Sequence, residues 1–200
     1  MIHSEKGGEP VLYAAAYQKT FSSRREELAY QRALADQLLW RALGQEYGVE
    51  AGSLQMARTP QGKPYFSGGS VHFSLSHCRG MVCCAVSRSP VGADVEGRRP
   101  VPRHLIDRVC TQEERTWLFS QPDQDAAFLS LWTLKESVMK LSGQGIAYGF
   151  QQASFTFGEQ GPVFREQDVH LSQFTLPGGY VLSAASREEH FRLVQVEDLG

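Results

Sequence analysis

The stretch GMVCCAVS at residues 80–87 returns as GYVLSAAS at residues 179–186, half the chain later. Each begins with a glycine turn signal and continues with small and apolar residues that are typical of a strand. A long helical pattern precedes the strands in each half. Two small-residue strands can also agree by coincidence. If the agreement reflects a duplication, the chain is an α+β protein of two similar α/β halves, related by a pseudo-twofold axis, with the active site in the cleft between them.

The composition is that of an ordinary globular protein of 200 residues, with 42% hydrophobic and 21% charged residues. This length permits one large domain or two small ones. A formal net charge of −2 and a pI of about 6.3 give no overall field that favours nucleic acid or an anionic membrane. The sequence therefore predicts neither as a partner, and any polyanionic ligand must be met by local lysines and arginines.

The sequence also carries information on the compartment. The polar first residues lack the features of a signal or transit peptide, and no apolar run approaches the ~18 residues of a bilayer span. The four cysteines contain no CxxC pair, which favours free thiols in a reducing compartment over a zinc site or a disulfide framework. We therefore expect a cytoplasmic protein, and we expect it to be a monomer.

The first half is predicted to begin with a strand and a long helix. Ser23 and Glu26 fit a capping box, and apolar residues recur from there at helical spacing. Turn residues then separate four short strand candidates, of which the last three suggest an antiparallel meander. The predicted ranges are strand 11–17, helix 24–43, strand 53–58, turn 59–64, and strands 71–76, 81–87 and 91–95.

A segment rich in arginine and proline at 98–102 reads as a linker, which divides the chain into domains 1–99 and 100–200. Two short helices are predicted next, the second opened by a capping box of Thr111 and Glu114. Asp125 is the predicted cap of the following helix, and glycines at 143 and 145 end it. The remainder is predicted as strands over 151–165 and 167–186, with a tight turn at Gly178-Gly179.

Two acidic residues stand out in the stretch VGADVE at 91–96. On a strand, Asp94 and Glu96 project from the same face about 7 Å apart, while the apolar residues between them face the other way. Carboxylates placed side by side on a partly buried face repel each other, so that one is protonated or a cation lies between them. The alternative is a solvated edge strand that carries two harmless acids.

A third carboxylate lies in the stretch WTLKESVMK at 132–140. Glu136 and Lys140 share one face of the predicted helix, and Lys135 is adjacent in sequence. A surface ion pair is the alternative, but the surrounding apolar residues leave only a narrow polar stripe on a buried helix. Three carboxylates, together with water and phosphate oxygens, can complete the octahedron that Mg²⁺ requires. Lys135 and Lys140 would then neutralise phosphate charge.

Four further residues are candidates for phosphate contacts, although each also has an ordinary structural reading. Ser76 and His77 end a predicted strand, Lys63 lies in a Gly-Lys-Pro turn, and Arg32 lies in the first helix. The sequence contains no Walker-type loop, GxSxG or HExxH motif. The chemistry is therefore expected to rest on positioning and charge, as phosphoryl transfer does.

These residues, in this order, resemble the motifs of a known family, the 4′-phosphopantetheinyl transferases of the surfactin-synthetase-activating type. That family has a Gly-Lys-Pro turn, a strand that ends in Ser-His, a Gly-x-Asp-x-Glu strand and a Trp-x-x-Lys-Glu-x-x-x-Lys helix. The similarity runs from about Arg32 to the last strands, and the last two motifs together are the most specific. The matching positions are Gly62-Lys63-Pro64, Ser76-His77, Gly92–Glu96 and Trp132–Lys140.

The resemblance implies an enzyme, a holo-[acyl-carrier-protein] synthase, with coenzyme A as donor and Mg²⁺ as cofactor. It would transfer the 4′-phosphopantetheine arm to a serine of an acyl or peptidyl carrier protein and release 3′,5′-ADP. The first half would bind the nucleotide and carry the metal strand, and the second would carry the Trp-x-x-Lys-Glu helix. The implied metal ligands are Asp94, Glu96 and Glu136; the implied catalytic residues are Glu136, Asp94 and Lys140; the implied coenzyme A contacts are Arg32, Lys63, Ser76, His77, Lys135 and Lys140.

Two other functions remain open from the sequence. A catalytically silent relative would bind carrier proteins or coenzyme A without turnover, although the charged set is complete. A different magnesium-dependent enzyme would act on a nucleotide pyrophosphate without any carrier. Within the transferase hypothesis, the sequence leaves open whether Glu136 or a metal-bound water takes the serine proton.

Overall fold

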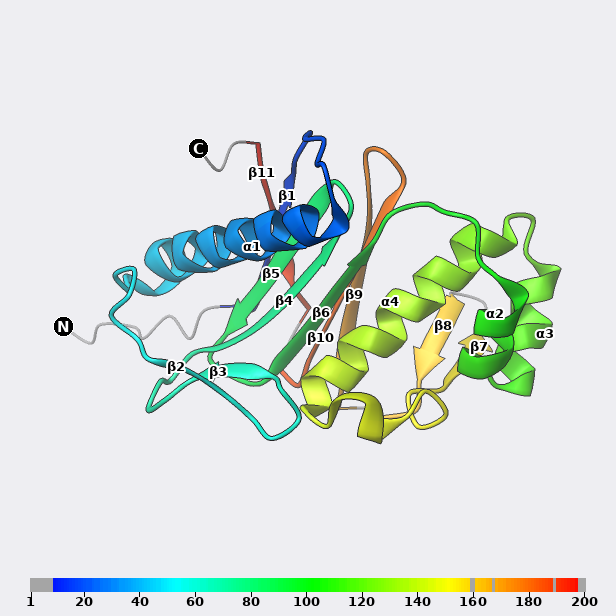
Figure 1. Ribbon diagram of the computed structural model, residues 1–200. Coiled ribbons are helices and arrows are strands. Elements are labelled where there is room, and N and C mark those ends of the chain that lie inside the picture. The colour runs from blue at the N-terminus through cyan, green and yellow to red at the C-terminus, as the bar shows by residue number, and fades with distance from the viewer. Residues whose placement is uncertain (1–8, 159–160, 167, 189, 198–200) are drawn as a thin grey trace.

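The computed structural model describes residues 9–158, 161–166, 168–188 and 190–197 (Figure 1). Two long helices and two main sheets dominate the fold. The helices are α1 (Arg24–Tyr47), α2 (Arg103–Val109), α3 (Gln112–Ser120), α4 (Gln124–Ser142) and the short 3₁₀ helix η1 (Gly145–Tyr148). The strands are β1 (Val11–Ala16), β2 (Met56–Arg58), β3 (Pro64–Phe66), β4 (His72–Cys78), β5 (Met81–Ser87), β6 (Val91–Glu96), β7 (Phe155–Gly158), β8 (Gly161–Phe164), β9 (His170–Leu176), β10 (Tyr180–Ser186) and β11 (Arg192–Val196).

The strand orders reveal an internal repeat of topology. The larger sheet has the order β11-β1-β5-β4 and the smaller sheet the order β6-β10-β9. We call the elements from β1 to β5 the first unit and those from β6 to β10 the second unit. In the first unit the central strand β5 pairs antiparallel with β1 and β4. In the second unit the central strand β10 pairs antiparallel with β6 and β9. Small two-stranded sheets, β2-β3 and β7-β8, take the same place in the two units. The repeated stretches at residues 80–87 and 179–186 fall on the two central strands, β5 and β10.

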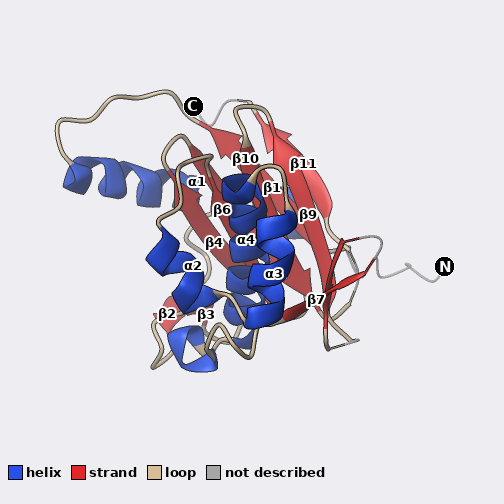
Figure 2. Cartoon of the chain, turned by 90° about the vertical axis from the view of Figure 1, so that its right-hand side faces the viewer, coloured by secondary structure: helices blue, strands red, loops and turns tan. Residues whose placement is uncertain are grey.

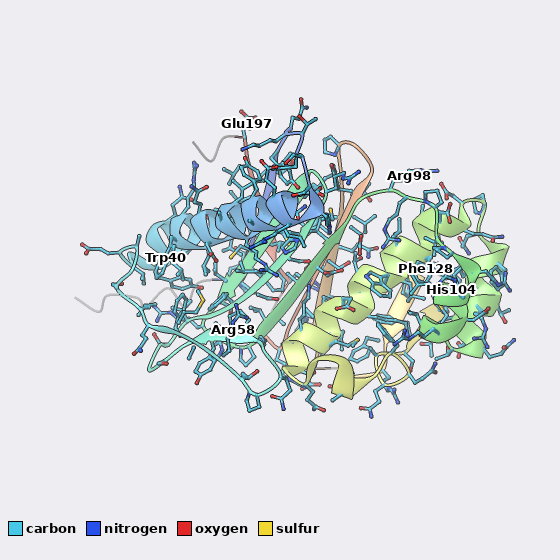
Figure 3. All side chains as sticks on the ribbon, in the orientation of Figure 1. Trp40, Arg58, Arg98, His104, Phe128 and Glu197 are labelled. Carbon is cyan, nitrogen blue, oxygen red and sulfur yellow. The ribbon has the colours of Figure 1, made fainter. Side chains whose placement is uncertain are left out.

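The two sheets lie between the two long helices (Figure 1), and α2 and α3 cover the outer side of α4 (Figure 2). Three apolar clusters correspond to these layers. One lies between α1 and the larger sheet, one lies among α2 to α4, β7, β8 and the smaller sheet, and one lies between the two sheets. Phe128 on α4 belongs to the second cluster and lies toward α2 and α3 (Figure 3). Burial of apolar surface in three clusters thus stacks the elements in layers.

The predicted start of α1 is confirmed, but only half of its capping box forms. Ser23 accepts a hydrogen bond from the backbone N–H of Glu26, whereas the Glu26 carboxylate binds Ser22 instead of Ser23. The helix continues to Tyr47, four residues beyond the predicted end. Gly48 stops it with φ of 65°, a left-handed conformation that glycine adopts without strain.

The helices of the second half follow the prediction with one correction. Thr111 and Glu114 form the predicted reciprocal capping box at the start of α3. The cap of α4 is Asp123 and not Asp125, because the Asp123 carboxylate accepts from the Ala126 N–H. Asp125 instead accepts from the Val101 N–H and so ties the preceding loop to the helix. Both aspartates are chemically suited to capping, so the local pattern alone was ambiguous.

The predicted antiparallel meander is wrong at its last strand. β4 and β5 form a hairpin, but β6 crosses to the other sheet and pairs with β10. The strands β3 and β11 were not predicted, and β11 runs parallel to β1 at the edge of the larger sheet. The tight turn at Gly178-Gly179 is confirmed between β9 and β10.

The boundary expected between residues 99 and 100 stays a prediction. The sheet topology groups β6 with the second unit, although β6 precedes that boundary. All four cysteines are free. No helix in the part of the chain that the structure describes is long and apolar enough to span a membrane.

Candidate active site

Asp94 lies at the junction of the two sheets, on the face of β6 that α4 covers. The side chain is buried, and its Oδ1 accepts two hydrogen bonds of 2.6 Å, from Ser76 Oγ on β4 and from Lys140 Nζ on α4. Its Oδ2 is also buried, and no described residue donates a hydrogen bond to it. A buried carboxylate oxygen without a partner is costly unless a ligand supplies one.

Gly92 explains how α4 comes so close to β6. A Cβ atom added at Gly92 would lie 1.9 Å from the Ser137 carbonyl oxygen and 2.4 Å from the Leu141 nitrogen, which no side chain tolerates. The helix backbone therefore packs directly on the strand at this point. This contact places Lys140, one turn from Ser137, over Ala93 and Asp94.

Lys140 bridges the helix and the strand. Its Nζ donates to the Ala93 carbonyl oxygen at 3.0 Å and to Asp94 Oδ1 at 2.6 Å. Burial alone would lower the pKa of Lys140, but the Asp94 carboxylate outweighs it, so the pKa is raised. The ammonium is therefore firmly charged. The described residues provide it with two acceptors, which leaves one of its three N–H donors for another.

Glu96 and Glu136 complete the predicted carboxylate set. Burial raises the pKa of Glu136, and the neighbouring Asp94 and Glu96 carboxylates add to the rise. Burial followed by Asp94 also raises the pKa of Glu96, although Arg99 forms an ion pair with it at 3.3 Å. The Asp94 carboxylate therefore acts electrostatically on both glutamates.

The fit of this set to a metal ion can be tested on the donor atoms. Among the described residues, no group of three or more His, Cys, Asp and Glu side chains is arranged so that it could hold a metal ion as it stands. The unpartnered Oδ2 of Asp94 and the raised pKa values of Glu96 and Glu136 nevertheless fit a nearby cation, which would relieve the repulsion. The binding of Mg²⁺ by Asp94, Glu96 and Glu136 therefore stays a prediction.

Two cavities adjoin this set. One, of about 280 Å³, is lined by Glu136, Lys140 and Lys63 together with apolar side chains such as Phe73 and Met139. The other, of about 630 Å³, is strongly polar. It is lined by Glu96, His77, Cys78, Tyr180, Gly97, Gly178 and four arginines, Arg24, Arg79, Arg98 and Arg99. Arg98 lies on the connection between β6 and α2 (Figure 3). The carboxylates stand between an apolar cavity and a cationic one.

Ser76 and His77 face opposite sides of β4, because successive side chains on a strand alternate. Ser76 contacts Asp94, and His77 lines the polar cavity. The Nδ1 atom of His77 is buried without a partner among the described residues. Burial, and then the charges of Lys140, Arg32 and Arg24, lower the pKa of His77. Arg32 is exposed on α1 and is near enough for its charge to act on His77, but it lines neither cavity.

Lys63 lies where predicted, in the turn between β2 and β3, and it lines the apolar cavity. Its Nζ is already engaged, since it donates to the Val91 carbonyl oxygen at 3.1 Å and to the Lys140 carbonyl oxygen at 2.6 Å. Burial and the nearby Lys140 charge lower the pKa of Lys63 to about 8. Its predicted contact with a nucleotide stays a prediction.

Lys135 requires a correction, because it lies away from the other candidates. Its side chain is completely buried on the face of α4 that turns toward α3 and β7. The Nζ atom forms an ion pair with Glu114 at 2.7 Å and donates to the carbonyl oxygens of Phe150 and Ala153. With all three donors used, Lys135 cannot neutralise a phosphate. Leu131 and Met139, four residues away on either side, share its helical stripe and could have signalled burial.

Sequence reasoning missed Ser74 and Arg79 near the site and left Arg24 without an assigned role. Ser74 on β4 accepts from the Ala93 N–H at 3.0 Å, and the alternation of Ser74 and Ser76 in the strand was an available signal. Arg24 and Arg79 line the polar cavity and share the buried Glu27 carboxylate. No sequence pattern joins residues 24 and 79, so only the fold brings them together.

Comparison with known proteins gives consistent matches. A family model described as 4′-phosphopantetheinyl transferase superfamily matches residues 90–185. The chain is 31% identical over 141 residues to the 4′-phosphopantetheinyl transferase psf-1 of Bacillus pumilus, an alignment that covers 65% of this chain and 60% of that protein. It is 25% identical over 174 residues to the 4′-phosphopantetheinyl transferase Sfp of Bacillus subtilis strain 168, across 83% of this chain and 78% of that protein. This chain therefore spans 60% of one relative and 78% of the other.

Among solved structures, the crystal structure of Thermotoga maritima holo-[acyl-carrier-protein] synthase is similar over 48% of this chain and 61% of that chain. The sequence identity in this comparison is 20% and the TM-score is 0.42.

Proposed function

We infer that the chain is a member of the 4′-phosphopantetheinyl transferase superfamily, which it resembles in sequence, and we propose that it transfers the 4′-phosphopantetheine arm of coenzyme A to a serine of an acyl or peptidyl carrier protein. The reaction would require Mg²⁺ and release 3′,5′-ADP. The observation that carries the proposal is the setting of Asp94. One carboxylate oxygen is held by Ser76 and Lys140, and the other is buried and free of any described partner.

Asp94, Glu96 and Glu136 would hold the metal ion. Bound there, Mg²⁺ would neutralise charge on the pyrophosphate oxygens of coenzyme A. Lys140 contributes to the same task, since its charge is secure and one of its donors is uncommitted. The cationic cavity, with His77 and four arginines, suits the phosphate groups of the nucleotide.

The transfer itself is a displacement at phosphorus. The serine Oγ forms a bond to the β-phosphorus of coenzyme A, and the bond from that phosphorus to the bridging oxygen breaks, so that 3′,5′-ADP leaves. The serine proton goes to Glu136, the carboxylate that the sequence also offers as the base. Lys140 stays protonated throughout and lies beside Asp94 to stabilise the charge of the phosphoryl oxygens.

The test combines the purified protein with coenzyme A, MgCl₂ and a panel of apo carrier proteins. Intact-mass spectrometry is expected to show at least one carrier that gains the phosphopantetheine arm, and chelation of the metal with EDTA is expected to prevent the gain. A carrier whose acceptor serine is replaced by alanine is the matched control. If a broad-specificity transferase modifies every carrier and this protein modifies none, the proposal is wrong.

A further inference from the structure

The edge of β6 that faces β4 is satisfied by side chains instead of a neighbouring strand. Within the described residues, β6 has a strand partner, β10, on its other edge. On the edge toward β4, the Val91 carbonyl accepts from Lys63 Nζ at 3.1 Å, and the Ala93 carbonyl accepts from Lys140 Nζ at 3.0 Å. Between them, the Ala93 N–H donates to Ser74 Oγ at 3.0 Å. Three buried backbone groups that would otherwise lack partners are thus paired.

Lys63 joins three separate elements through one ammonium group. It comes from the turn between β2 and β3, which is closed by a hydrogen bond of 2.9 Å from the Thr59 N–H to the Lys63 carbonyl. Besides Val91 on β6, it reaches the Lys140 carbonyl oxygen at 2.6 Å. That oxygen is among the last carbonyls of α4, which attract positive charge, and it also accepts from the N–H of the cap residue Gly143 at 3.3 Å. Lys63 therefore fastens the end of α4 to the start of β6.

The consequence concerns Asp94 and Lys140. The Lys140 ammonium donates a hydrogen bond to Asp94, while the Lys140 carbonyl accepts one from Lys63. The position of the Lys140 ammonium beside Asp94 therefore depends on how Lys63 holds the Lys140 backbone. Ser74 fixes the backbone of Ala93, which precedes Asp94. A shift of α4 along β6 would separate Lys140 and Glu136 from Asp94.

We propose that Lys63 and Ser74 are positioning residues, which hold β6 against α4 and so keep Asp94, Glu136 and Lys140 in register, and that neither makes its main contribution by contact with substrate. The kinetic consequence rests on the proposed transferase function, whereas the structural consequence does not. Two kinds of measurement therefore separate a failure of this inference from a failure of the proposed function.

The first measurement is hydrogen–deuterium exchange on the protein without substrate. Lys63→Met and Ser74→Ala are expected to speed amide exchange about tenfold in peptides that cover residues 91–96 and 139–143, with no change in residues 34–43 of α1. Arg58→Met is the matched control, because Arg58 donates within the same hairpin, to the Gly62 carbonyl, at 2.9 Å. Unchanged exchange at 91–96, or faster exchange across the whole chain, overturns the inference. If Lys63→Met fails to fold, Ser74→Ala and Lys63→Arg carry the test.

The second measurement is steady-state kinetics with calorimetric binding of 3′,5′-ADP. Lys63→Met is expected to lower kcat by about ten- to a hundredfold, because small displacements of reacting groups are that costly, while KM for coenzyme A and Kd for 3′,5′-ADP change by less than about threefold. Lys63→Arg, which keeps charge and donors, is expected to restore most of kcat. A large rise in KM and Kd with kcat preserved would instead make Lys63 a nucleotide ligand and overturn the inference. A wild-type protein without transferase activity would contradict the proposed function, and the exchange result would still decide this inference.

Discussion

The two units of the molecule use the same strand position in opposite ways. In the first unit Tyr13 on β1 pairs with Cys84, and in the second Asp94 on β6 pairs with Ser183. Cys84 and Ser183 occupy the same place in the two repeated stretches, so Tyr13 and Asp94 are equivalent. By the same register Ala15 corresponds to Glu96.

The two equivalent positions differ in the helix side chains that surround them. Tyr13 is buried under α1, and its hydroxyl donates to Glu46 Oε1 at 2.6 Å and lies 3.0 Å from Gln45 Oε1, near the end of that helix. Asp94 lies under α4, which contributes Lys140 and Glu136. One unit thus fills the space between strand and helix with core, while the other keeps a charged group with an unpartnered oxygen there. The comparison teaches that the same strand position can serve packing in one unit, through Tyr13, and hold a reactive charged group in the other, through Asp94.

The largest expected effect is the loss of activity in Asp94→Asn. The variant keeps the shape of the side chain but removes the charge that faces Lys140 and the proposed metal ion. Turnover is expected to fall at least about a thousandfold, in line with the loss of a group that acts electrostatically in the reaction. The rate of carrier modification, followed by mass spectrometry, measures it. Transfer at close to the wild-type rate would remove Asp94 from the mechanism and with it the contrast between the units.

The next effect concerns stability. It tests the difference between two lysines of α4, Lys135, which is buried against Glu114, and Lys140, which lies beside Asp94. Lys135→Met leaves the Glu114 carboxylate buried without its cation, so the free energy of unfolding is expected to fall by about 3–5 kcal/mol. Urea denaturation measures this loss. The double variant Lys135→Met/Glu114→Gln is expected to recover part of the loss. If Lys135→Met instead keeps its stability and loses affinity for coenzyme A, the phosphate role that the sequence suggested would return.

A smaller effect should appear with pH. The pKa of Lys63 is lowered to about 8 by burial and by Lys140, whereas the unfolded chain keeps the ordinary value of about 10.4. Between these values the unfolded state binds a proton that the folded state has lost, so this residue makes the folded state more stable as pH rises. From pH 7.5 to 9.5, wild-type protein is expected to gain about 2 kcal/mol relative to Lys63→Met in urea denaturation. An equal pH dependence in both proteins would contradict the lowered pKa.

The smallest effect is expected at the counterpart of Asp94. Tyr13→Phe removes the hydroxyl that binds Gln45 and Glu46, which is expected to cost about 0.5–1.5 kcal/mol of stability. Transferase activity is expected to remain unchanged, because the first unit supplies packing at this position. Thermal melts and the carrier assay measure the two quantities. A strong loss of activity with little loss of stability would show that the division of roles between the units is wrong.

Local patterns were sufficient where local forces decide the structure. The capping box of Thr111, the end of α4 at Gly143 and the turn at Gly178-Gly179 all depend on residues close in sequence. The same holds for the equivalence of β5 and β10, because both carry the repeated stretch.

Long-range choices were the ones that failed. The pairing of β6 with β10 depends on which strand edge is available in the folded protein, and the sequence of β6 does not indicate which edge that is. Lys135 and Glu136 face different surroundings, because α4 is covered on two sides, by the smaller sheet and by α2 and α3 (Figure 2). Adjacent residues on a helix lie about 100° apart, so neighbours in a motif need not share a site. The motif therefore located the helix correctly but assigned Lys135 to the wrong side of it.

The parallel pairing of β11 with β1 has a consequence for synthesis on the ribosome. β1 is synthesised well before β11, yet β11, at residues 192–196, is its outer neighbour. Until those residues leave the exit tunnel, one edge of β1 has no strand beside it, and exposed strand edges invite pairing with other chains. The first unit therefore cannot complete its sheet before the second has been translated, so the nascent protein is expected to mature in one late step instead of half by half.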